Sequence, residues 1–185
     1  MRAALELHAV VGPAATSLSA VAERAGVQRN TLYRHFPDER SLFYACSGLH
    51  VDEHPMPDVA AWRVVADPAE RAARGLGQLY AYWEETETLT ANVLRDAEVD
   101  AVVREVNEDR VAGLMAAMRD ALLDAWAQRD RSERLVAMVE LALAFHTWQS
   151  LVRRSGLANA DAASLMASSF VAAAAAGGGA AESAA

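Results

Sequence analysis

A single glycine between two short helical segments limits what this chain can fold into more than any other feature of the sequence. Apolar residues recur at helical spacing in Ser17–Ala25, with Thr16 as the expected cap, and again in Gln28–Phe36. Gly26 stands just past the first helix end, where glycine adopts a positive φ at little cost. We expect the next residue, Val27, to point into the core. The sequence therefore predicts two short helices joined by a tight turn.

The rest of the chain also has helical spacing, and no segment has the alternating pattern of a strand. Alanine, the best helix former, is used throughout. We expect the other helices at residues 3–12, 39–51, 67–86, 90–97, 101–127, 132–155 and 159–176. The predicted fold class is all-α.

The charges divide the chain into parts. The formal net charge is -8 over 185 residues, and all 17 basic residues are arginine. Residues 1–50 nevertheless hold five arginines against four acids, whereas the remainder holds twelve against twenty-one. Such asymmetry indicates parts with different partners. We expect a three-helix N-terminal domain at 1–46, a larger helical domain at 47–176, and a disordered low-complexity tail at 177–185.

Polar side chains gather on the second short helix, which would be the recognition helix of a helix-turn-helix. Arg29 has the donors to pair with guanine, Asn30 can pair with adenine, and Thr31 can touch a thymine methyl group or a phosphate. Tyr33 and His35 are long enough to reach phosphates. The expected DNA contacts are Thr16, Ser17, Gln28, Arg29, Asn30, Thr31, Tyr33, Arg34, His35 and Arg40. The same spacing is also compatible with an amphipathic helix whose polar face is merely solvated.

Residues 3–44 resemble the DNA-binding domain of the TetR/AcrR family of bacterial repressors. The matching segments are AALEL, Gly12, ATS at 15–17, VAERAGV, TLYRHF and the helix start at 38–42. The resemblance implies a homodimer that binds a palindromic operator in double-stranded DNA and responds to a small-molecule effector. It assigns base reading to Arg29, Asn30, Thr31 and Tyr33, and phosphate positioning to Thr16, Ser17, Tyr33 and His35.

Three positions depart from the family pattern. Glu39 stands where the resemblance implies a phosphate-binding lysine, although Arg40 follows it. His8 stands where an aromatic core residue is usual, and the first helix lacks the usual extra turn and basic arm. These departures favour, as the alternative, a sensor or ligand-binding protein of the same fold with weakened DNA binding.

The larger predicted domain holds all four tryptophans. A mostly apolar cavity is a usual ligand site in a helical bundle, and the resemblance implies an effector there. The expected lining residues are Tyr80, Trp83, Met115, Trp126 and His146, with ordinary core packing as the alternative for each. The segment 135–148 is apolar nearly all round and should bury a second face against a partner. Together with the last helix, it predicts a homodimer.

Other chemistries find little support in the sequence. His50 and His54 have a metal-binding spacing, but Pro55 and Pro57 indicate that the helix has ended, so we expect no metal and no cofactor. Cys46, the single cysteine, should be a buried thiol. No nucleophile and base pair stands out, so we expect no enzyme, although a helical enzyme that uses the aromatic cavity is a further alternative.

Two further expectations concern the acidic segments and the location of the protein. The acids at 84–87 and 96–100 should form solvated faces. The longest apolar stretch, 135–148, is shorter than the ~20 residues that a membrane-spanning helix needs. The N-terminal segment has no signal-peptide pattern, so we expect a cytoplasmic protein without a membrane segment.

Overall fold

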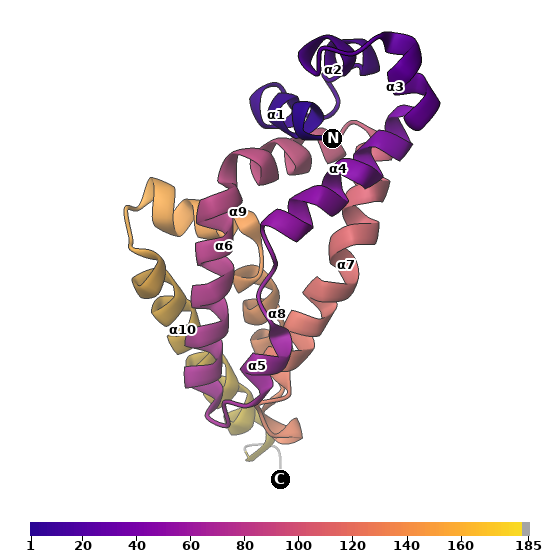
Figure 1. Ribbon diagram of the computed structural model, residues 1–185. Coiled ribbons are helices and arrows are strands. Elements are labelled where there is room, and N and C mark those ends of the chain that lie inside the picture. The colour runs from indigo at the N-terminus through magenta and orange to yellow at the C-terminus, as the bar shows by residue number, and fades with distance from the viewer. Residues whose placement is uncertain (183–185) are drawn as a thin grey trace. The chain divides into compact units, whose positions relative to one another are not determined.

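The computed structural model describes the backbone of residues 1–182, and the regular elements in that part of the chain are all helices (Figure 1). The predicted all-α class is confirmed. In chain order the elements are α1 (Arg2–Val10), α2 (Leu18–Arg24), α3 (Arg29–His35), α4 (Glu39–Glu53), α5 (Val59–Arg63), α6 (Pro68–Ala97), α7 (Ala101–Leu123), the 3-10 helix η1 (Gln128–Asp130), α8 (Glu133–Ala142), α9 (Phe145–Trp148), the π-helix η2 (Gln149–Arg154) and α10 (Asn159–Glu182).

The chain forms two compact units, and two helices take part in both. Unit 1 holds Met1–Met56 and Glu85–Gly113, and unit 2 holds Pro57–Glu84 and the chain from Leu114 onward. Helix α6 therefore begins in unit 2 and ends in unit 1, whereas α7 begins in unit 1 and ends in unit 2. This grouping differs from the predicted boundary, which follows the chain and places everything from 47 to 176 in one domain.

Packing against α4 explains why residues from the middle of the chain join unit 1. Phe43 of α4 is buried with Val103 and Val106 of α7. Burying these side chains removes apolar surface from water, which is the main force that holds such a unit together. Unit 1 is therefore completed by segments that are distant in sequence.

The predicted tight turn between the short helices is present. Gly26 has a φ of 67°, and its N–H donates to the Glu23 carbonyl at 3.1 Å. The N–H of Val27 donates to the Ala22 carbonyl at 3.0 Å, so the last carbonyls of α2 are paired. The side chain of Val27 is 42% exposed, so its predicted place in the core is wrong. Other residues fill that core: Ala4, Leu18, Val21, Ala22, Leu32, Leu42 and Cys46.

The cap of α2 also differs from the prediction. Ser17, one residue after the expected cap, accepts a hydrogen bond from the Ala20 N–H at 3.2 Å. Thr16 is buried, and its hydroxyl donates to the Gly12 carbonyl at 2.7 Å. Thr16 therefore stabilises the turn between α1 and α2, while Ser17 begins α2.

Helix α6 is a single helix of 30 residues, where the sequence predicts two. Asp67 begins it by accepting the Glu70 N–H at 2.7 Å. No glycine or proline stands between Thr86 and Thr90, so the backbone ladder continues through the predicted gap. Helix α7 ends at Leu123, four residues before its predicted end.

The segment predicted as one helix from 132 to 155 is broken after α8. The helices Glu133–Ala142 and Phe145–Arg154 are bent by 73° relative to each other. A break leaves carbonyls without helical partners, and the Tyr80 hydroxyl donates to the Ala142 carbonyl at 3.0 Å. The neighbouring rings Trp83, Phe145 and Trp148 pack on one another, with centroids 5.3 to 6.3 Å apart. Hydrophobic periodicity alone does not reveal such a break.

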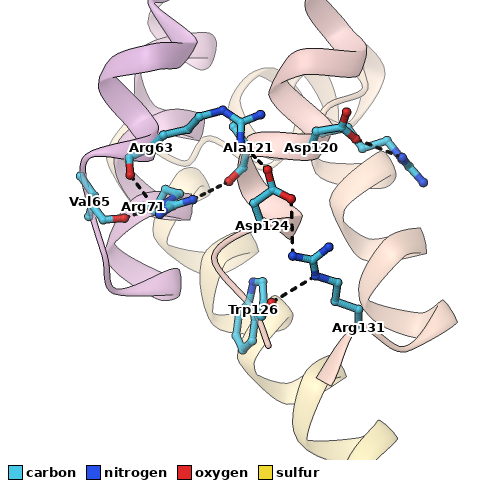
Figure 2. Close-up of polar contacts among 9 residues, drawn as sticks. Arg63, Val65, Arg71, Asp120, Ala121, Asp124, Trp126 and Arg131 are labelled. Carbon is cyan, nitrogen blue, oxygen red and sulfur yellow. Dashed lines mark hydrogen bonds and ion pairs between the residues drawn. The ribbon is translucent and has the colours of Figure 1, made fainter. Parts of the chain in front are cut away.

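A buried arginine holds helix ends together in unit 2. Figure 2 shows the guanidinium of Arg71 among three backbone oxygens. It donates to the carbonyls of Val65 at 2.7 Å, Ala121 at 2.9 Å and Arg63 at 3.2 Å. The end of α5, the last turn of α7 and the first turn of α6 are therefore joined through one side chain.

Helix α10 continues to Glu182, so the tail predicted as disordered is helical over residues 177–182. Alanines on both sides of the glycines favour the helix there. The rest of that prediction, on residues 183–185, lies outside the described residues. Within residues 1–182 no single helix is long and apolar enough to cross a membrane, whereas the bent pair Glu133–Ala142 and Phe145–Arg154 meets those criteria together.

Candidate nucleic-acid interface

Helix α3 presents nearly all of its polar residues to the outside. Leu32 is 7% exposed and packs into the core of unit 1, which fixes the side of α3 that faces inward. Tyr33 is 40% exposed. The other polar residues of α3 are also exposed, as is Gln28 at the N-cap position. These exposed α3 residues are Arg29, Asn30, Thr31, Arg34 and His35. This is the arrangement that a recognition helix needs, with one apolar anchor and a polar outer face.

The arginines of unit 1's N-terminal segment fall into two groups. Three have acidic partners: Arg2 pairs with Glu53, Arg24 with Glu6 and Arg40 with Glu105. Within the described residues, Arg29 and Arg34 form no ion pair and no hydrogen bond. The two arginines of this segment that lack an acidic partner therefore both lie on α3.

The two residues at the start of α2 have different surroundings. Ser17 is exposed, although its hydroxyl already caps the helix. Thr16 is 3% exposed and its hydroxyl is used inside the protein, so the predicted phosphate contact by this side chain does not fit its position.

The comparison with known families agrees with this geometry. Residues 1–46 match the model of the bacterial regulatory proteins of the tetR family. Residues 1–46 are therefore similar to the DNA-binding domain of the TetR family. This bears out the predicted resemblance over residues 1–46.

The chain was also compared with solved structures and with curated proteins. The crystal structure of a TetR transcriptional regulator from Rhodococcus sp. RHA1 is similar, with 23% identity and a TM-score of 0.48 over 93% of this chain and 90% of that chain. No curated protein matches the chain at a significant level.

The α1 end of this TetR-family domain is held by polar residues that sequence reasoning missed. Asn92 of α6 donates to the carbonyls of His8 at 3.0 Å and Ala9 at 2.9 Å. Asp96, 5% exposed, accepts the Ala14 N–H at 2.9 Å and pairs with Arg95. The expectation that the acids at 96–100 are all solvated is therefore wrong for Asp96. Its partner is 82 residues away in sequence, so no local signal could have shown it.

Two titratable side chains are buried in unit 1. His8 is 4% exposed, its Nε2 has no partner within the described residues, and burial lowers its pKa to about 4. Cys46 is the buried thiol that the sequence predicts, and burial raises its pKa to about 11. The thiolate is disfavoured there, so Cys46 is a core residue.

The histidines considered for a metal site adopt another arrangement. The rings of His50 and His54 lie 4.9 Å apart, and His54 Nδ1 lies 2.8 Å from Glu85 Oε1. No cluster of three potential metal ligands occurs among the residues that the structure describes.

The five residues predicted to line an effector site all lie in unit 2, with different exposures. Tyr80 and Trp83 are buried and stack on each other with ring centroids 5.6 Å apart. Met115 and Trp126 are half-buried, and the buried indole N–H of Trp126 has no partner in the described part of the chain. His146 is exposed and contacts Gln149. Tyr80 and Trp83 are thus placed as core, whereas Trp126 has an unused donor.

The acids at 84–87 are expected to be solvated, but Glu84 contacts other side chains. Glu84 accepts the side-chain N–H of Asn159 at 2.6 Å and pairs with Arg153 at 3.3 Å. Asn159 also accepts the indole N–H of Trp148 at 2.9 Å. These contacts join α6, η2 and the start of α10.

Proposed function

We propose that the protein is a TetR-family regulator that acts in the cytoplasm as a homodimeric repressor. It binds a palindromic operator and leaves it when a small apolar or aromatic effector binds. The observation that carries the DNA-binding part is the state of the arginines on α3. Because Arg29 and Arg34 are exposed and unpaired within the described residues, placing them against DNA breaks no ion pair.

Each α3 side chain has a role that fits its chemistry. Arg29, the first residue of α3, offers two parallel donors to the O6 and N7 atoms of guanine, and Asn30 can make a bidentate pair with adenine. Tyr33 and His35 reach phosphates, which fix the register of the helix on the duplex. Leu32 anchors α3 to the core, so these side chains are presented together.

The dimer is supported by apolar side chains left outside unit 2. Leu141 of α8 is 49% exposed, and Leu165 and Val171 of α10 are 51% and 45% exposed. The opposite side of α10 is already buried in the unit, through Ala163, Met166 and Phe170. A two-fold contact through the exposed side chains would let two copies of α3 read two half-sites about one DNA turn apart.

The effector is supported by the unused donor of Trp126 within an aromatic and methionine-containing unit. A buried indole N–H usually has a partner, so an effector with an acceptor oxygen or nitrogen suits this position. Typical coupling between two sites is about 1–3 kcal/mol, a 5–150-fold loss of operator affinity. Compounds that quench tryptophan fluorescence and raise the melting temperature, yet leave operator affinity unchanged, would count against this switch.

Substitution of Arg29 tests operator recognition. We expect Arg29→Ala to weaken binding to an inverted repeat that the wild type selects from random-sequence duplexes by about 1–3 kcal/mol, with relaxed preference at one base pair per half-site. Arg74→Ala is the matched control, because Arg74 is an exposed helical arginine of unit 2. Fluorescence anisotropy with the repeat and with a mixed-sequence duplex gives both affinities. Equal losses on the two duplexes would show that Arg29 contacts only phosphate.

A sensor with weakened DNA binding is the second candidate. It is favoured by the pairing of Arg2, Arg24 and Arg40 with acids, which leaves few free cations in residues 1–50. An operator-binding protein loses affinity steeply with salt, because each phosphate contact releases counterions. A flat salt dependence together with tight effector binding would favour the sensor.

A further inference from the structure

Arg40 follows α3 closely in the chain, but unlike the arginines of α3 it forms an ion pair. It lies in the first turn of α4, three residues beyond Pro37, and its Nη1 lies 2.5 Å from Glu105 Oε1 of α7. The side chain of Arg40 is 51% exposed and that of Glu105 is 38% exposed. The pair is therefore open to solvent and to anything that approaches the start of α4.

Other contacts bring Glu105 to this position, independently of its pairing with Arg40. The Tyr44 hydroxyl of α4 bonds to Asp109 of α7. Arg110 of α7 donates to the Ser47 hydroxyl at 3.0 Å and to the Tyr44 carbonyl at 2.8 Å. Together with the buried contacts of Phe43, these bonds hold α7 along α4. Removing the charge of Glu105 therefore leaves this packing in place.

The N-terminus of α4 leaves Arg40 as the group on that turn that can attract an anion. Asp38 caps the helix and accepts the Ser41 N–H at 2.8 Å, so a carboxylate already fills the cap position. Glu39 adds a second exposed negative charge. A phosphate near this turn would meet two acids and one arginine whose charge is already shared with Glu105.

We propose that Glu105 competes with DNA phosphate for Arg40 and thereby lowers the affinity of the protein for DNA. This inference rests on the proposed DNA binding through α3. An exposed ion pair contributes little to folding, so Arg40 can exchange Glu105 for a phosphate without loss of the fold. Glu105 is thus a positioning residue that sets the strength of one backbone contact.

The test compares Glu105→Gln with Glu108→Gln on a fluorescein-labelled duplex of mixed sequence. Glu108 is exposed on the same helix, so both variants change the net charge equally. We expect Glu105→Gln to tighten binding at low salt by about two- to fivefold, the range that one exposed charge pair allows. The slope of log affinity against log salt should become steeper by up to about one, the effect of one extra phosphate contact. The melting temperature should stay close to that of the wild type.

The decisive control makes Glu105→Gln in a protein that also carries Arg40→Ala. The gain from Glu105→Gln should vanish when Arg40 is absent. An equal gain from Glu108→Gln, or a gain that persists in the Arg40→Ala background, would overturn the inference. If the wild type binds and Arg29→Ala weakens it while Glu105→Gln changes nothing, only this inference fails. If neither the wild type nor Glu105→Gln binds the duplex, the proposed function and the inference fail together.

Discussion

His8 is an imidazole held in an apolar place. Its ring packs edge-to-face on Phe43, with centroids 5.2 Å apart, and its Nε2 lacks a partner within the described residues. Burial lowers the pKa of His8 to about 4, while the charge of Asp96 acts in the opposite direction. The neutral ring therefore belongs to the folded state, whereas the unfolded chain takes up the proton at its ordinary pKa.

This difference predicts a loss of stability in mild acid. Unfolding takes up a proton between the unfolded pKa of 6.5 and the folded pKa of about 4, so stability falls as the pH falls through that window. The free energy of unfolding should drop by about 2 kcal/mol between pH 7 and pH 5 through His8 alone. Urea unfolding at both pH values should show that His8→Phe loses about 2 kcal/mol less than the wild type. An identical pH dependence in the two proteins would exclude this role of His8.

For single residues, the sequence predicts features set by neighbouring residues but not contacts with residues far away in the chain. The apolar anchor Leu32 and its polar neighbours follow from helical spacing, and the structure places them as predicted. The pairing of Arg40 with Glu105 joins residues 65 apart in sequence, and no pattern near either residue shows it. Thr16 does not cap α2 as predicted, because its hydroxyl has a backbone acceptor four residues earlier, which competes with the cap position.

At the scale of the helices, Arg71 is a buried side chain whose hydrogen bonds join separate elements. Its guanidinium satisfies carbonyls from two helix ends while being 7% exposed. We expect Arg71→Met to lower the free energy of unfolding by about 2–4 kcal/mol, because buried carbonyls lose their donor. Arg74→Met, on an exposed side of the same helix, should change it by less than about 0.5 kcal/mol. Thermal and urea unfolding measure both, and similar losses would contradict the assigned role.

The order of the helices can be predicted from the sequence, but some of the helix ends cannot. The Asp67 cap and the Gly26 turn are chemical signals that act locally, and both predicted ends are present. The break after Ala142 has no glycine or proline to mark it. It is stabilised by Tyr80, which is 62 residues away, so only the folded chain shows it.

For the whole molecule, the exposed apolar side chains of α8 and α10 predict the oligomeric state. Leu141→Glu combined with Leu165→Glu should convert the proposed dimer to a monomer, because charges would replace apolar contacts across the two-fold interface. Both side chains are about half exposed, so each unit should keep its fold. Val64→Glu is the control, since Val64 is 84% exposed in unit 2 and lies outside both helices. Sedimentation velocity at micromolar concentration distinguishes the outcomes, and a dimer that survives the double substitution would refute this interface.

Unit 1 is built from two chain segments, Met1–Met56 and Glu85–Gly113, and this affects how it folds during synthesis on the ribosome. Residues up to Met56 emerge first, but Phe43 must wait for Val103 and Val106 of α7. At about 5–20 residues per second, that wait lasts several seconds. During it, one apolar side of α4 stays open to chaperones and proteases. Chains arrested between Met56 and Ala101 should therefore be cut in α4 by limited proteolysis, and chains released after Gly113 should resist it.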